Sequence, residues 1–289
     1  MTRVIIFITL IFSVSELFAQ KVSYYPDQYS LFFYNLPLVN PSYVEKSGKA
    51  AFNASYKART GPFKKIATYA FTGDLIFRKA NESAHAGRVL VLSQKEGPYI
   101  SRPSAYLNYA YLVPVSKETA IFAGVAVGFS GIYFSAPSAS GAGSSILPDG
   151  SIGIGFRSRG FSAGLSSMQI FNSEAQPIQT AIVLKTYYNT FVSYEHDLDA
   201  YWKFYSYGLW RALPAARDDL NLALLLKFQE TIGFGGVLRP GKGIAFFASL
   251  YPLEKKNTFS ISAAYNSSFL STLPSWHNSI EFTMHYTIN

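Results

Sequence analysis

Histidine and its acidic neighbours are the residues of this chain that could do acid/base chemistry. The four histidines are His85, His196, His277 and His285. His196 lies between Glu195 and Asp197, but a catalytic base also needs an oriented partner and a pocket. Because Glu195–Asp197 falls at the end of a predicted strand, we interpret it as a solvated turn. No HExxH pattern and no cysteine are present, so the sequence predicts no metal site.

A serine beside His285 could supply the nucleophile of a lipid-modifying enzyme. Nothing in the spacing selects one serine, and alternation places His285 on one strand face with Glu281 and Thr283. The glycine-rich segments 153–156 and 233–236 have no following helix and therefore do not predict phosphate loops. They indicate bends or close backbone approach within strands. We predict no catalytic residue and no cofactor, and an enzyme remains the weakest alternative.

His285 lies near the end of the chain, on a predicted strand whose two faces differ. One face carries the apolar residues Ile280, Phe282, Met284, Tyr286 and Ile288, and the other carries Glu281, Thr283, His285 and Thr287. Successive side chains of a strand point to opposite sides, so one side is apolar and the other polar. This pattern is typical of an outer-membrane β-barrel, whose last strand pairs with its first and removes both sheet edges.

Similar alternating runs recur through the chain and are separated by Gly, Pro, Asn, Asp and Ser clusters. The predicted strands are 50–59, 65–77, 84–93, 104–113, 118–133, 151–157, 161–171, 184–194, 201–209, 220–228, 231–238, 243–251, 258–266 and 279–288. They predict a transmembrane antiparallel up-and-down barrel of about fourteen strands, an even number as in bacterial single-chain barrels. The Pro148-Asp149-Gly150 triplet predicts a turn, and the stretch 135–148 predicts a long loop.

Targeting and composition agree with an exported barrel. Residues 1–19 resemble a signal peptide: Arg3 precedes an apolar run, and cleavage is expected after Ala19. Hydrophobic residues make up 49% of the chain without gathering into a later apolar helix. The net charge of +8 fits loop solubility, lipopolysaccharide contact, an anionic partner or a positive lumen. The basic residues form no stripe, so no nucleic acid is expected. A secreted soluble β-protein stays open as a structural alternative.

Residues 20–49 differ from the barrel pattern of residues 50–289. The segment is rich in apolar side chains, yet Pro37 and Pro41 forbid a continuous helix or a central strand. An irregular segment with so many apolar residues should pack inside the barrel mouth or against a partner. A short plug and a docking element both remain open.

Three short motifs in this segment carry a family resemblance. They are Gln28-Tyr29-Ser30, Phe33-Tyr34-Asn35 and Asn40-Pro41-Ser42-Tyr43. Their order after a signal peptide and before alternating strands resembles the opening of the PorP/SprF family of Bacteroidetes outer-membrane proteins. The family pattern has Ala where this chain has Ser42, and its Gly arrives later here, at Gly48.

The resemblance implies a non-enzymatic barrel of the type IX secretion and gliding machinery in the outer membrane. The implied partners are a secreted adhesin or its C-terminal domain, other type IX components, outer-membrane lipid and lipopolysaccharide. We predict that Tyr29, Asn35, Asn40 and Pro41 seat the segment. Asn35 and Asn40 would cap turns through their side chains, and Pro41 would fix the exit direction. The alternative function is an outer-membrane transport channel for small hydrophobic or polar solutes.

Overall fold

The computed structural model describes residues 21–79, 82–135, 141–178, 180–252, 257–268 and 278–289. The expected signal peptide, residues 1–19, lies outside the described residues. Within the described part, no helix is long and apolar enough to cross a membrane.

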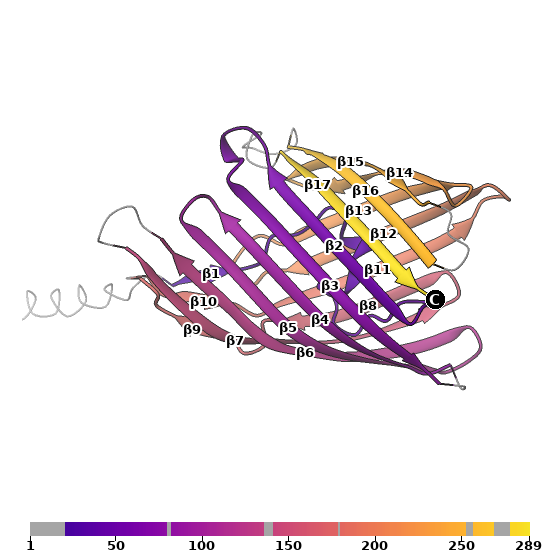
Figure 1. The fold of residues 1–289 in the computed structure, drawn as a ribbon, viewed down its shortest axis with the longest axis horizontal. Helices are drawn as coiled ribbons and strands as arrows, with labels where there is room; N and C mark the ends of the chain where they lie inside the picture. Colours follow the sequence, from indigo (N-terminus) through magenta and orange to yellow (C-terminus); the bar gives the residue numbers. More distant parts are fainter. Residues whose placement is uncertain (1–20, 80–81, 136–140, 179, 253–256, 269–277) are drawn as a thin grey trace, which may run out of the picture.

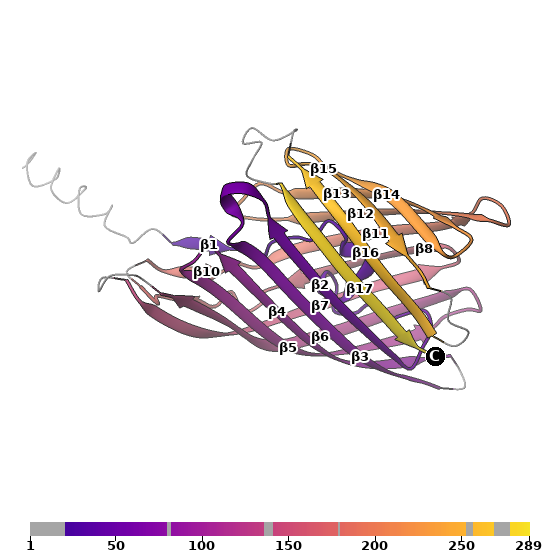
Figure 2. The same ribbon diagram turned by 45° about the horizontal axis from the view of Figure 1, so that its top comes forward.

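Fourteen strands form one closed antiparallel barrel (Figures 1 and 2). In chain order the barrel strands are β2 (Ala50–Arg59), β3 (Ile66–Arg78), β4 (Ala84–Glu96), β5 (Ile100–Pro114), β6 (Thr119–Phe134), β7 (Gly143–Ser158), β8 (Phe161–Met168), β11 (Tyr187–Asp197), β12 (Trp202–Ala212), β13 (Asp219–Phe228), β14 (Ile232–Arg239), β15 (Gly243–Leu250), β16 (Asn257–Ser267) and β17 (Ser279–Ile288). The predicted fold class and strand number are confirmed.

The barrel closes where the last strand meets the first. β17 pairs antiparallel with β2 along the full length of both strands, from Ser279 opposite Arg59 to Ile288 opposite Ala50. This seam leaves the barrel without an unpaired edge, which would otherwise be a template for aggregation.

The two faces of the wall differ as the alternation predicts. On β17, the side chains of Phe282 and Met284 are each 47% exposed, whereas Glu281 and Thr283 on the inner face are 0% and 2% exposed. An apolar exterior and a polar interior are the reverse of a water-soluble protein and match a transmembrane barrel.

The two rims differ in the length of their connections. The rim that we call the long-loop end has the connections 60–65, 97–99, 135–142, 169–186, 213–218, 240–242 and 268–278. The opposite rim, the short-turn end, has the connections 79–83, 115–118, 159–160, 198–201, 229–231 and 251–256. β2 begins and β17 ends at the short-turn end, so the C-terminus lies there (Figure 1).

The start of the described chain lies at the other rim. β1 (Val22–Tyr24) pairs in parallel with β10 (Ile182–Leu184), and β10 pairs antiparallel with β9 (Glu174–Ala175). Both β9 and β10 belong to the connection 169–186 of the long-loop end, and Figures 1 and 2 show β1 beside them. Residues 25–49 therefore run through the lumen from the long-loop end to the short-turn end.

Two short 3₁₀ helices lie on this path, η1 (Phe32–Tyr34) and η2 (Leu36–Leu38). A further 3₁₀ helix, η3 (Gly61–Phe63), lies outside it, in the connection between β2 and β3. Pro37 occupies the first turn of η2, and Pro41 follows it, so neither helix can lengthen.

The predicted turn at residues 148–150 is wrong. β7 continues through these residues and pairs with β6, with Pro148 opposite Phe129. β8 pairs with β7 only between Ser151 and Ser158, so Pro148 lies beyond the end of β8 and its missing N–H costs no bond on that side. The predicted long loop is shorter for the same reason, since β7 already begins at Gly143.

Candidate functional site: the N-terminal segment inside the barrel

The segment from Gln28 to Val44, which we call the lumen segment, forms a hydrophobic core with the inner wall. Its contribution to the core consists of Leu31, Phe32, Phe33, Leu36, Val39 and Val44, which pack with wall residues that include Ile76, Phe122, Phe191, Leu209, Val237 and Phe247. The ring of Phe33 stacks on Tyr207 at 4.6 Å between centroids. Burial of each large side chain contributes about 1.5–3 kcal/mol, so the lumen segment is held by a core like that of a soluble domain.

A buried carboxylate binds the beginning of the lumen segment. The Glu281 carboxylate accepts hydrogen bonds from the backbone N–H groups of Ser30 (2.9 Å to each oxygen) and Leu31 (3.0 Å). Asn266 Nδ2 donates a further bond at 3.2 Å, and Lys57 Nζ lies 3.8 Å away. A carboxylate that accepts several N–H groups makes stronger bonds than a neutral acceptor. Glu281 therefore fixes where the lumen segment meets β17.

The side chain of Asn40 joins the lumen segment to two neighbouring wall strands. Its Nδ2 donates to the carbonyl oxygens of Ile154 (3.1 Å) on β7 and Leu165 (3.2 Å) on β8. Its Oδ1 accepts from the N–H (2.9 Å) and hydroxyl (2.7 Å) of Ser42. The second set of bonds is the turn cap expected of Asn before Pro.

Glycines in the wall leave room for this part of the lumen segment. A Cβ at Gly124 would lie 2.5 Å from the carbonyl oxygen of Pro41, and one at Gly153 would lie 2.0 Å from Asn40 Oδ1. At Gly153 the neighbouring atoms belong to the side chains of Asn40 and Pro41. These contacts place the backbone of β6 and β7 directly against the segment.

An ion pair of the wall binds the carbonyl groups that follow Asn40. Arg88 forms two 2.7 Å bonds with Asp74, and both side chains are buried. Arg88 also donates to the carbonyl oxygen of Tyr43 at 2.8 Å, while Asn108 Nδ2 donates to that of Pro41 at 2.9 Å. Sequence reasoning missed these wall residues, although Arg88 lies within the predicted strand 84–93.

The four residues predicted to seat the segment lie at separate places along it. Asn40 and Pro41 meet β6, β7 and β8 as described. Asn35 is buried and accepts a 3.2 Å bond from Thr72 Oγ1 on β3, but it makes no turn-capping bond. Tyr29 is buried, and its hydroxyl has no hydrogen-bond partner among the described residues. Their roles in seating or in partner binding stay predictions.

Two of the histidines contact neighbouring side chains of the barrel wall. His285 contacts Asn53 Oδ1 at 2.6 Å and Thr287 Oγ1 at 2.8 Å on the inner wall. His196 is exposed as the penultimate residue of β11 and stacks on Tyr194. His277 lies outside the described residues. In the described ranges, no group of His, Asp and Glu side chains could hold a metal ion.

Residues 25–31, where the chain enters the lumen, should be held less firmly at acidic pH. Burial raises the pKa of the Asp27 carboxyl, but Lys57, whose Nζ lies 3.0 Å away, and Arg239 and Arg59 lower it to well below its ordinary 3.8. The stabilisation is therefore complete above about pH 4 and is lost as the pH falls below that value. Hydrogen–deuterium exchange of residues 25–31 should accelerate as the pH falls from about 4 to 2, beyond the intrinsic effect of pH. At each pH, Asp27→Asn is the reference that should show no such acceleration.

Comparison with known proteins assigns the chain to a family. The family model described as type IX secretion system membrane protein PorP/SprF matches residues 21–286. Three solved structures share the barrel fold. The CymD monoaromatic hydrocarbon channel has a TM-score of 0.57 at 11% identity over 87% of this chain and 91% of its own. A FadL homologue from Pseudomonas aeruginosa has a TM-score of 0.52 at 10% identity over 83% and 89%.

The third is a TodX ΔS2S3 mutant monoaromatic hydrocarbon channel, with a TM-score of 0.52 at 9% identity over 88% of this chain and 94% of its own. No curated protein compared with the chain matches it. The family match covers nearly all of the described residues, from the start of β1 into β17. The chain belongs to the PorP/SprF family of type IX secretion system membrane proteins.

Proposed function

We propose that this barrel lies in the outer membrane and binds or anchors a secreted surface protein, such as an adhesin, as a non-enzymatic component of type IX secretion. The observation that carries the proposal is the filled lumen. The hydrophobic core of the lumen segment and its bonds to Glu281 and from Asn40 hold the segment inside the barrel between the two rims. A barrel whose lumen is filled by a segment of its own chain is better suited to display of a partner protein than to conduction of solutes.

The orientation follows from the rims. Bacterial barrels have short periplasmic turns and longer extracellular loops, so the long-loop end faces the cell surface in this proposal. The small sheet of β1, β9 and β10 lies at that end, where a secreted partner and lipopolysaccharide would meet it. Other type IX components complete the set of proposed partners. Export with cleavage after Ala19 belongs to the same proposal.

A transport channel is the second candidate. Similar barrels include proteins described as hydrocarbon channels, and a cavity remains between the lumen segment and the wall. Solute flow would require the lumen segment to move. Conductance of the purified barrel in planar bilayers distinguishes the two, since a filled lumen should carry little current.

Affinity capture tests the anchoring function. A tagged chain is purified from outer membranes of its own cells, and the proteins that copurify are identified by mass spectrometry. We expect a large secreted adhesin or type IX components. A barrel that purifies without either, and that conducts ions or solutes, would favour the channel.

Replacement of Asn40 links the lumen segment to this function. Asn40→Ala removes two donated and two accepted hydrogen bonds, each contributing about 0.5–1.5 kcal/mol. We expect several-fold lower surface display of the partner with normal membrane insertion, measured by surface immunoblotting and heat-modifiable migration. Asn257→Ala, at the short-turn end of β16, is the matched control. Unchanged display in Asn40→Ala would contradict a role for the seated segment.

A further inference from the structure

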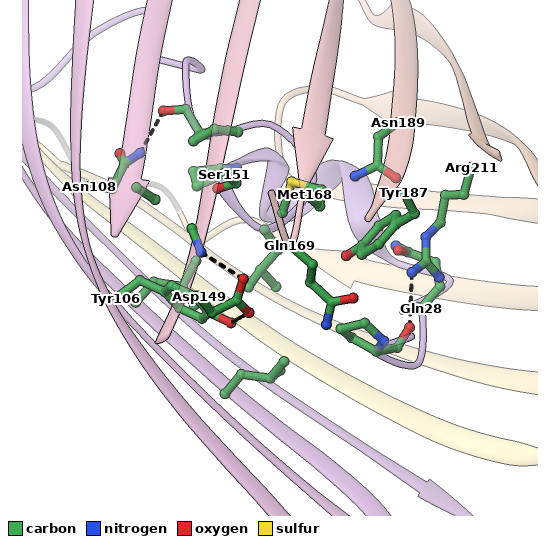
Figure 3. Close-up of a pocket in the computed structure, with 18 of the residues that line it drawn as sticks. Gln28, Tyr106, Asn108, Asp149, Ser151, Met168, Gln169, Tyr187, Asn189 and Arg211 are labelled. Carbon is green, nitrogen blue, oxygen red and sulfur yellow. Dashed lines mark hydrogen bonds between the residues drawn. The ribbon is translucent and has the colours of Figure 1, made fainter. Parts of the chain in front are cut away.

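A cavity remains between the lumen segment and the wall in the half of the barrel nearer the long-loop end. Its volume is about 70 Å³, which exceeds the space of one water molecule. Residues of β4 to β8, β11 and β12 form one side, and the segment forms the other. Figure 3 shows Asp149 and Tyr106 on one side of the space, Tyr187 and Arg211 across from them, and Gln169 between.

Asp149 is the most unusual group in this cavity. Its side chain is buried, and its carboxylate accepts bonds from Tyr106 (2.6 Å), Ser130 (3.1 Å) and the Gly150 N–H (2.6 Å). Throughout the described ranges, no Lys or Arg forms an ion pair with it, whereas Asp74 and Asp219 both have such partners. A buried carboxylate without a cation is costly. The cavity therefore has a position that favours a positively charged ligand group.

Three further polar atoms on residues that line the cavity have no partner. They are the Tyr29 hydroxyl, Asn189 Oδ1 and Arg211 Nε, all buried. Arg211 uses another nitrogen to donate to the Pro26 carbonyl oxygen at 3.0 Å, which leaves its Nε–H unused. Buried polar atoms are nearly always satisfied in native proteins. The two free donors, Arg211 Nε–H and the Tyr29 hydroxyl, suit a ligand group that accepts hydrogen bonds.

Apolar side chains complete the lining. Leu38 from the lumen segment and Leu90, Leu92 and Met168 from the wall contribute methyl and methylene groups. A short hydrocarbon chain would replace water there favourably. The lining thus combines one carboxylate without a cation, the Arg211 side chain across from it (Figure 3), the Tyr29 hydroxyl and several aliphatic side chains.

We propose that this cavity is a binding site for a short aliphatic amino acid, whose ammonium group pairs with Asp149 and whose carboxylate accepts from Arg211 and Tyr29. Such a ligand contacts both the wall and the lumen segment. Because it binds only when the segment is seated, it stabilises the seated state by mass action. The site goes beyond the anchoring function and does not depend on the identity of the secreted partner.

Calorimetric titration of the purified full-length barrel in detergent tests the proposal with three compounds of matched size. 4-Aminobutyrate has both charged groups, n-butylamine has only the cation and butyrate has only the anion. We expect 4-aminobutyrate to bind most tightly, n-butylamine more weakly and butyrate most weakly. Asp149→Asn keeps the shape of the side chain and should weaken binding of the two amines by about tenfold or more. Asp197→Asn, at the exposed end of β11, should leave binding unchanged.

A second measurement reports on the segment itself. The chain has no cysteine, so Val44→Cys, at a fully buried position of the segment, supplies a single thiol whose labelling by maleimide measures unseating. Saturating 4-aminobutyrate should slow this labelling severalfold. If Asp149→Asn does not fold, Tyr29→Phe, which removes only the free hydroxyl, replaces it in both experiments and should weaken binding of 4-aminobutyrate and butyrate. Absence of binding by all three compounds would show that the cavity holds no such ligand, and equal affinity in the wild type and Asp149→Asn would show that binding does not use the Asp149 carboxylate; either result overturns the proposal.

Discussion

Gly124→Ala is expected to displace the lumen segment while the barrel stays closed. The added methyl group would lie 2.5 Å from the Pro41 carbonyl oxygen and 2.6 Å from Ser42 Cα. Both contacts are with backbone, which cannot turn aside as a side chain can, and overpacking of this kind costs about 1–3 kcal/mol. Maleimide labelling of the Val44→Cys thiol should therefore accelerate by about tenfold or more. Surface display of the secreted partner should fall in parallel.

Gly87→Ala is the matched control for this steric argument. Gly87 lies on β4, another wall strand, and a Cβ there would meet no atom within 4 Å. Its labelling rate should equal that of the parent protein. Fast labelling in both variants would mean that any loss of strand glycine loosens the wall, and equal slow labelling in both would mean that the segment is not seated against β6.

Loss of the Glu281 carboxylate should release the beginning of the segment. Glu281→Ala removes the acceptor of the Ser30 and Leu31 N–H groups and leaves Asn266 and Lys57 with one partner fewer. Removing one member of a buried charged network typically costs about 3–5 kcal/mol. We expect exchange of the Ser30 and Leu31 amide hydrogens to become much faster, as measured by hydrogen–deuterium exchange, with the β2–β17 seam still protected.

Two further variants isolate the effect of the charge. Glu281→Gln retains one acceptor oxygen and should give an intermediate exchange rate. Glu230→Ala removes a partly exposed carboxylate in the turn between β13 and β14, which pairs there with Lys203 and Lys227, and should leave Ser30 unaffected. Slow exchange at Ser30 in Glu281→Ala would show that the hydrophobic core alone holds the segment.

The architecture of the wall could be predicted because lipid and lumen impose opposite demands on successive residues. The first and last barrel strands have the predicted bounds, 50–59 and 279–288, since both alternate without interruption. Alternation also placed Glu281 on the polar face of its strand. It could not tell that Glu281 would bind the N–H groups of Ser30 and Leu31, because that depends on the path of the lumen segment.

The errors have a local cause. Pro148-Asp149-Gly150 has the composition of a turn, but its position beyond the end of β8 lets the strand continue. Turn propensity is a statement about nearest neighbours, whereas the length of β7 is set by its pairing with β6. As a consequence, Asp149 lies on the inner wall beside the cavity and not in a solvated turn, so sequence reasoning did not consider it as a site residue.

The segment was recognisable as unusual, yet its direction through the barrel was not predictable. Prolines and clustered aromatic residues indicate packing against something, but Ser30 and Glu281 are separated by almost the whole chain. Contacts of such separation leave no periodic signal in the sequence. The parallel pairing of β1 with β10 at the far rim is therefore information that only the structure supplies.

The path of residues 25–49 also constrains how the molecule can be assembled. These residues enter at one rim and leave at the other directly into β2, and β2 is one side of the seam that closes last in the sequence. A completed cylinder would have to be threaded from end to end, whereas an open sheet can curl around a chain already lying on it. We therefore expect the segment to pack against the open sheet before β17 pairs with β2, so that the apolar side chains of the segment lie inside the barrel when it closes.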